Sequence, residues 1–332
     1  MSDAVEAGVP VQASDAARQC SNFTYKGRCG YANCRFLHDE SARQAALEER
    51  AQAKQATISR SSASTRPSDV PPPPQGRPSV PTSLRFLLRG ESVRSHPYLK
   101  KFAAMPWLQR LMDSPFCEKL FHVQGRRLRK ELTEAIGLLH ACERALSKHA
   151  VKEDSESKGR PVTIVDLCSG KGFGSLVLAC SFPDSQVIAV DLNPNMDLAH
   201  FGLCPNLSFR EMNLESAATT GELVDMLMSR PQDGLVLLVG VHLCGMLSIH
   251  AARLFRQVPG PAALVLAPCC LDKRLPGIKQ RAKRLGIDPY VYWCLKLLIE
   301  EVPASCRREL FQDDDMQTSR NSFVIGLKSG RH

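Results

Sequence analysis

The residues from Pro161 to Ala179, PVTIVDLCSGKGFGSLVLA, have the types and the spacing of a nucleotide-binding turn. An apolar, β-branched run ends at Asp166, a short turn contains Gly170 and Gly172, and apolar residues then follow at helical spacing. A strand, a glycine turn and a helix in this order bring backbone N–H groups close to a nucleotide-like ligand. The sequence therefore predicts a cofactor site at this turn.

A second predicted strand, Gln186 to Val190, is followed by Asp191, which lies 25 residues after Asp166. A carboxylate at the end of the second strand can accept both ribose hydroxyls of a nucleotide. Asn213 directly follows the third predicted strand, Leu207 to Met212. We expect these polar side chains to lie at one edge of one sheet.

The run Asp166-Leu-Cys-Ser-Gly170-Lys-Gly172 resembles motif I of the class I S-adenosylmethionine-dependent methyltransferases, although a glycine is common where Cys168 stands. The resemblance implies that the turn lies under the amino-acid part of the cofactor and that Asn213 lies beside the adenine amine. It implies six cofactor-binding residues: Asp166, Cys168, Gly170, Gly172, Asp191 and Asn213.

Two other interpretations of the same turn stay open. One is a nicotinamide or flavin site, for which Gly174 falls one position too early to complete G-x-G-x-x-G. The other is a methyltransferase fold that has lost its activity.

A second group of reactive side chains follows the fourth and fifth predicted strands, in His242-Leu-Cys244-Gly and Pro268-Cys269-Cys270. In one interpretation His242 orients or deprotonates a hydroxyl acceptor, because imidazole titrates near neutral pH. In another, Cys269 or Cys270 adds to a pyrimidine ring as a nucleophile. The four side chains could also form a second zinc site, or they could only pack. We take His242, Cys269 and Cys270 as the catalytic candidates.

The pair H-x-C-G and P-C-C resembles a methyltransferase-domain group that includes the eukaryotic tRNA acceptor-stem ribose 2′-O-methyltransferases. The resemblance covers roughly Thr163 to Lys328, and it implies an RNA substrate with tRNA favoured. The second, CHHC-type finger of those enzymes has no counterpart in this sequence.

Near the amino terminus, Cys20, Cys29, Cys34 and His38 have the spacing C-x8-C-x4-C-x3-H. Three thiolates and one imidazole form the closed tetrahedral ligand set of a structural zinc site. The segment resembles CCCH zinc fingers, most of which bind RNA, and aromatic and basic residues alternate within it. The alternatives are a finger that is only structural or one that binds protein.

The net charge of +9 over 332 residues is unevenly distributed. Residues 84–149 carry 13 basic and 6 acidic side chains, a net charge of +7, whereas residues 150–332 are neutral. This distribution favours a polyanionic partner, most simply RNA. The plainer interpretation is a solvated basic helix face.

These patterns predict an α/β fold, a Rossmann-like, doubly wound and mainly parallel sheet with a helical extension before it and a tethered zinc finger. We expect residues 1–18 to be disordered, 19–40 to form the finger, 41–83 a helix and then a Pro/Ser-rich linker, 84–150 a basic helical segment, and 151–332 the methyltransferase domain.

Neither a secretory signal nor an apolar run long enough for a bilayer is found in the sequence, so we expect no membrane partner. The 13 cysteines favour reduced thiols in an intracellular protein, cytoplasmic or nuclear. The oligomeric state stays open. The expected activity is S-adenosylmethionine-dependent methyl transfer to RNA, with a protein methyltransferase or a noncatalytic RNA-binding adaptor as alternatives.

Overall fold

The computed structural model describes residues 38–45, 47–48, 52, 81–121, 125–150, 161–230, 234–271 and 277–329. The chain divides into two compact units, Met1–Gln75 and Gly76–His332. In the first unit, residues 40–45 are helical, and Asp39 accepts a hydrogen bond of 2.9 Å from the Ala42 backbone N–H at the start of this helix. The segment expected to be disordered and the Pro/Ser-rich linker up to residue 80 lie outside the described residues, whereas the last residues expected in the linker already belong to a helix that begins at Thr82.

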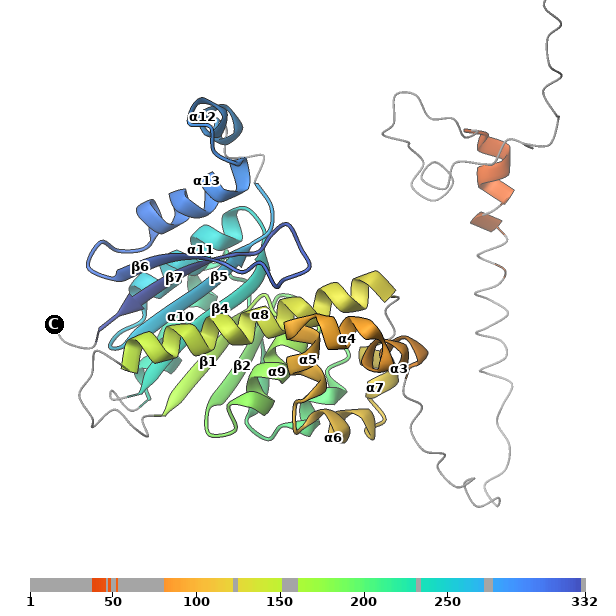
Figure 1. The fold of residues 1–332 in the computed structure, drawn as a ribbon. Helices are drawn as coiled ribbons and strands as arrows, with labels where there is room; N and C mark the ends of the chain where they lie inside the picture. Colours follow the sequence, from red (N-terminus) through yellow and green to blue (C-terminus); the bar gives the residue numbers. More distant parts are fainter. Residues whose placement is uncertain are drawn as a thin grey trace, which may run out of the picture. The chain divides into compact units, whose positions relative to one another are not determined.

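The second unit is built on a seven-stranded sheet with the order β3-β2-β1-β4-β5-β7-β6 (Figure 1). All adjacent pairs among the first five strands are parallel, whereas β7 runs antiparallel to both β5 and β6. The predicted α/β fold with a mainly parallel sheet is therefore confirmed. The strands are β1 (Val162–Leu167), β2 (Gln186–Asp191), β3 (Leu207–Glu211), β4 (Leu235–Leu243), β5 (Ala262–Pro268), β6 (Arg307–Gln312) and β7 (Ser322–Lys328).

The central strands are apolar throughout because both faces of the sheet are covered. On β1, Ile164 belongs to one hydrophobic cluster, and its neighbour Val165 belongs to the cluster on the opposite face. Successive side chains of a strand point to opposite faces, so a strand between two helical layers needs an apolar residue at every position.

One face is covered by the helices that precede β1 together with α9 and η2. The long helix α8 lies across this face and contacts β4, β5 and β7 (Figure 1). The apolar stripe of α8 is buried from Leu128 to Cys142. These elements are α3 (Thr82–Arg89), α4 (Glu91–Ser95), α5 (Pro97–Ala103), α6 (Leu108–Met112), α7 (Cys117–Leu120), α8 (Gly125–Ala150), α9 (Phe173–Ser181) and η2 (Ala199–Leu203).

The opposite face is covered by helices that follow the later strands. They are α10 (Ala217–Met228), α11 (Met246–Gln257), α12 (Ile278–Arg284) and α13 (Pro289–Lys296), which continues into the π-helical turn η3 (Leu297–Glu301). Within the part of the chain that the structure describes, no helix is long and apolar enough to cross a bilayer.

Candidate active site

The predicted cofactor turn is a left-handed bend between β1 and α9. The backbone φ angles are 57° at Cys168, 54° at Gly170 and 70° at Gly172. The bend is fastened to β2, because the Ser169 N–H donates a hydrogen bond of 2.9 Å to the carbonyl of Val190. Glycine adopts this conformation at little cost, which explains two of the three positions, whereas Cys168 is strained there.

The two glycines of the turn have different surroundings. A Cβ atom on Gly172 would lie within 2.5 Å of the Phe201 ring, so a larger residue at the start of α9 would have to displace this ring. A Cβ atom on Gly170 would have no neighbour within 4 Å. The turn is therefore packed on the Phe201 side and open at Gly170, where a ligand can approach the backbone.

Asp191, at the end of β2, points toward this turn. Its Oδ2 accepts a hydrogen bond of 2.9 Å from the Gly170 N–H, and its Oδ1 accepts one of 3.0 Å from the Asn193 N–H. Each carboxylate oxygen has a second lone pair, so the group can still accept hydroxyl donors.

Asp166 is buried below the same turn. It accepts a hydrogen bond of 2.6 Å from the Ser175 hydroxyl. Burial and the nearby charge of Asp191 raise the pKa of Asp166 to about 6, against the opposing effect of Ser175. Burial, followed by the charges of Asp191 and Asp166, also raises the pKa of Cys168 to about 12, so this side chain stays a neutral thiol.

Asn213 follows β3 and the buried Met212. Its side-chain Oδ1 accepts a hydrogen bond of 3.0 Å from the Glu215 N–H, and its carbonyl accepts 2.7 Å and 3.0 Å bonds from the Thr219 hydroxyl and the Ser216 N–H. The structure thus holds Asn213 in the turn before α10. Its role beside an adenine stays a prediction.

Two buried polar atoms near the turn were not singled out by sequence reasoning. The Ser169 hydroxyl and His200 Nε2 are buried and have no hydrogen-bond partner within the described residues. Burial lowers the pKa of His200, and the backbone of Lys171 partly offsets this effect. Unpaired buried polar atoms are costly, so they fit a polar ligand at this turn. No spacing rule marks either residue, because only the folded turn brings them there.

His242 lies on the strand beside β1, near the end of β4. It has a left-handed φ of 65°, at the point where the register between β4 and β5 shifts. Its Nε2 lies 3.0 Å from Glu134 Oε2, and Lys130 Nζ lies 2.7 Å from Glu134 Oε1. Glu134 is buried, whereas the His242 side chain is 45% exposed and open to a substrate.

The charges around Glu134 determine its ionisation. Burial raises its pKa, but the hydrogen bonds and charges of His242 and Lys130 outweigh this effect, so the pKa lies below its usual value. Helix α8 therefore supplies an ionised carboxylate to His242. Sequence reasoning missed this partner, because 108 positions separate the two residues along the chain.

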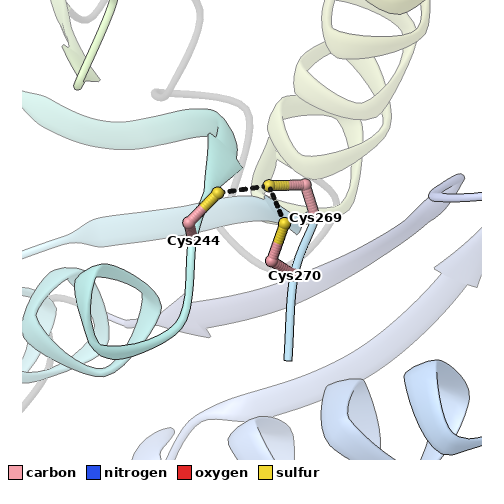
Figure 2. Close-up of side chains that lie close together, drawn as sticks. All are labelled: Cys244, Cys269 and Cys270. Carbon is pink, nitrogen blue, oxygen red and sulfur yellow. Dashed lines mark hydrogen bonds between the residues drawn. The ribbon is translucent and has the colours of Figure 1, made fainter. Parts of the chain in front are cut away.

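Three cysteines meet at the ends of β4 and β5 (Figure 2). Cys244 Sγ lies 2.6 Å from Cys269 Sγ, which lies 3.4 Å from Cys270 Sγ. The His242 imidazole is not part of this cluster, because it faces Glu134 and only the His242 carbonyl lies near Cys269, at 3.5 Å. The structure thus differs from the interpretation in which His242 joins the three thiols around one metal ion.

Cys269 is a poor nucleophile in this arrangement. Burial, and then its hydrogen bonds with Cys244 and Cys270, raise the pKa of the Cys269 thiol well above its usual range. Because the thiolate is the reactive form, this environment disfavours the interpretation in which Cys269 attacks a pyrimidine.

The sheet order places these groups side by side at one edge. Strands β2, β1, β4 and β5 are consecutive neighbours, and their carboxyl ends carry Asp191, the glycine turn, His242 and the cysteines in this order. Strands β2 and β3 lie on one side of β1, whereas β4 and β5 lie on its other side, so the strand order switches between β1 and β4. Open α/β sheets bind ligands at such a switch point. The first three finger ligands, Cys20, Cys29 and Cys34, lie outside the described residues, and His38 is the first residue described.

Comparison with known proteins decides the class of this domain. Residues 138–274 match the family model described as a methyltransferase domain. The chain carries a methyltransferase domain. The match begins inside α8 and ends just after the cysteine pair, so it contains the glycine turn, Asp191 and His242. The observed sheet is the Rossmann-like one predicted from the resemblance to class I, S-adenosylmethionine-dependent enzymes.

Solved structures with similar folds are also methyltransferases. The antibiotic-resistance methyltransferase Kmr is 14% identical, with 54% of this chain and 91% of that chain covered and a TM-score of 0.32. A putative methyltransferase from Haloferax volcanii, solved with the activator Trm112, is 12% identical, with 61% and 94% covered and a TM-score of 0.36. Alignments with such low identities and TM-scores add no support to the assignment of the methyltransferase domain. No curated protein matches the chain.

Proposed function

We propose that this protein transfers a methyl group from S-adenosylmethionine to RNA, with tRNA as the favoured substrate and the segment 19–40 as a zinc finger that aids RNA binding. The observation that carries the cofactor assignment is the Asp191 carboxylate held against the Gly170 amide beside an open turn. The unpaired Ser169 hydroxyl supports it, because a buried donor there lacks a partner within the described residues.

The bound cofactor supplies an electrophilic methyl group on a sulfonium. The residues of the chain would hold and align it: Asp191 accepts hydrogen bonds from the ribose hydroxyls, and the glycine turn lets the backbone approach closely. His242 orients the acceptor and takes its proton at Nδ1, because its Nε2–H donates to the Glu134 carboxylate, which fixes the ring. Alignment supplies most of the acceleration in a displacement of this kind, so a strong base is not required.

The RNA assignment is supported by the charges of the helical segment before the sheet. Several of its basic residues are already paired with carboxylates, as Arg144 and Lys148 are with Glu309. Arg85 and Arg89 on α3 are exposed and are not within salt-bridge distance of any carboxylate in the described part of the chain. Between them, Phe86 is 80% exposed.

An exposed aromatic ring between two unpaired cations suits an unstacked base with its phosphates. Helix α12 adds four exposed basic residues after the cysteine pair, which suit contacts with a phosphate backbone: Lys279, Arg281, Lys283 and Arg284.

The test is methyl transfer from labelled S-adenosylmethionine to total RNA and, separately, to total protein, followed by mass spectrometry of nucleosides. We expect label in RNA, recovered as one methylated nucleoside. Label only in protein would replace RNA with a protein substrate, and the finger would then serve recruitment. Failure of the cofactor to bind in calorimetry would favour a noncatalytic RNA-binding adaptor.

A further inference from the structure

The cysteines at the ends of β4 and β5 form a cluster that methyl transfer does not use. Cys244 follows β4, and Cys269 and Cys270 follow β5 (Figure 2). Their three sulfur atoms all lie within 4.8 Å of one another, and within the described residues this is the one group of three metal-ligating side chains so placed. Three converging thiols are a soft ligand set of the kind that selects zinc.

We propose that Cys244, Cys269 and Cys270 bind one Zn²⁺ ion through three thiolates and leave its fourth coordination position open to an external ligand. The inference does not depend on RNA being the substrate. It also differs from a closed site with His242 as the fourth ligand.

The backbone already holds the three ligands in place. The Gly245 N–H, one residue after Cys244, donates a hydrogen bond of 3.3 Å to the carbonyl of Cys270. This bond joins the segment after β4 to the segment after β5, so only side-chain rotation is needed to bring the sulfurs around an ion.

The distances between the sulfur atoms would suit a bound zinc ion after one of them increases. With Zn–S bonds of about 2.3 Å, tetrahedral geometry places sulfur atoms about 3.8 Å apart. The Cys269–Cys270 separation of 3.4 Å is close to this, whereas the Cys244–Cys269 separation of 2.6 Å must widen by about 1.2 Å. Cys244 is exposed, so its side chain has room to turn.

The open position follows from where His242 points. The His242 imidazole is engaged with Glu134 and Lys130 on α8, and no other His, Cys, Asp or Glu among the described residues joins the cluster. Three protein ligands with a free fourth position are typical of sites that present the metal to water or substrate, whereas structural sites are closed. The ligand taken there would be water, a thiolate or an imidazole. Binding releases the three thiol protons to solvent.

The first test uses the wild-type full chain. The reduced protein is alkylated with and without added Zn²⁺, and each cysteine is quantified by peptide mass spectrometry. We expect Zn²⁺ to protect Cys244, Cys269 and Cys270 at least tenfold and a chelator to restore their alkylation. The matched control is the thiol pair Cys180 and Cys204, whose sulfurs lie 2.7 Å apart with no third ligand, and which should stay unprotected.

The second test separates this site from the predicted finger. The triple variant Cys244→Ser, Cys269→Ser, Cys270→Ser should hold one zinc fewer per chain than wild type, whereas Cys180→Ser with Cys204→Ser should lose none. In Co²⁺-loaded protein of the variant Cys20→Ser with Cys29→Ser, sulfur-to-cobalt absorption should remain and should shift when imidazole is added.

Two results would overturn the inference. One is equal alkylation of the three cysteines with and without Zn²⁺. The other is recovery of a Cys244–Cys269 disulfide from freshly purified, unreduced protein with no bound zinc. A cobalt spectrum that imidazole leaves unchanged would overturn the open fourth position.

Discussion

Glu134 Oε2 lies 3.0 Å from His242 Nε2, so a buried carboxylate of α8 holds an imidazole at the end of β4. The pair joins the helix that precedes the sheet to the edge where the cofactor turn lies. Lys130 contacts the same carboxylate from one turn earlier on α8. Removal of the Glu134 charge therefore leaves both neighbours, His242 and Lys130, without their charged partner.

We predict that Glu134→Gln lowers the free energy of unfolding by about 1–3 kcal/mol, since a part-buried charged hydrogen bond is lost. The matched control is Glu131→Gln on the same helix, whose partner Arg127 is 77% exposed and whose loss should cost about 0.5 kcal/mol or less. Urea unfolding of both variants measures the difference. Equal costs would show that the His242 contact is not stabilising.

The difference in unfolding free energy between wild type and Glu134→Gln should depend on pH in one direction. The folded-state pKa of Glu134 lies below its usual value of 4.5, so its stabilising contribution is present above that pH and declines as the pH falls further. The gap between wild type and Glu134→Gln should therefore narrow below about pH 4.5.

For Asp166 we predict the opposite dependence of folding stability on pH. Its pKa rises to about 6 in the folded state from 3.8, so its contribution is fully present below about pH 4 and is lost as the pH rises through 6. The difference corresponds to roughly 3 kcal/mol. Asp166→Asn should abolish this decline. A stability difference between wild type and Asp166→Asn that is flat from pH 4 to 7 would contradict the buried, raised-pKa state.

Asp191→Ala should weaken S-adenosylmethionine binding by about 10–100-fold, because a charged acceptor of the ribose hydroxyls is lost. Isothermal titration calorimetry measures the change. Asp184→Ala, an exposed acid just before β2 begins, is the control and should bind normally. Unchanged affinity in Asp191→Ala would remove the ribose role from this residue.

Gly172→Ala should destabilise the domain by about 3 kcal/mol, through left-handed strain and collision with the buried Phe201 ring. Gly202→Ala makes the same chemical change where a Cβ meets nothing within 4 Å, and it should cost about 0.5 kcal/mol or less. Thermal unfolding distinguishes the two. Similar melting temperatures would mean that α9 accommodates the methyl group.

Arg85→Ala with Arg89→Ala should weaken RNA binding and reduce the slope of log affinity against log salt by about 1.5, as expected for two lost phosphate contacts. The control is Arg127→Ala, an exposed arginine that is already paired with Glu131. Fluorescence anisotropy across a salt series measures both. An unaltered slope in the double variant would exclude α3 from the RNA surface.

The sequence by itself determined the sheet. Apolar runs that end in polar residues predicted the five parallel strands, because a strand buried on both faces must be apolar and its end must return to solvent. The same logic placed Asp191, the glycine turn, His242 and the cysteines at strand ends. The matched methyltransferase domain agrees with the class expected from Asp166, Gly170 and Gly172.

The tertiary structure alone decided the partners of those residues. Nothing in the spacing of α8 marks Glu134 as the residue that holds His242, and no local pattern separates the His242 imidazole from the three thiols beside it. The unpaired Ser169 and His200 atoms also appear only in the fold. Secondary structure is encoded over a few neighbouring residues, whereas contacts across 108 positions depend on how whole layers pack.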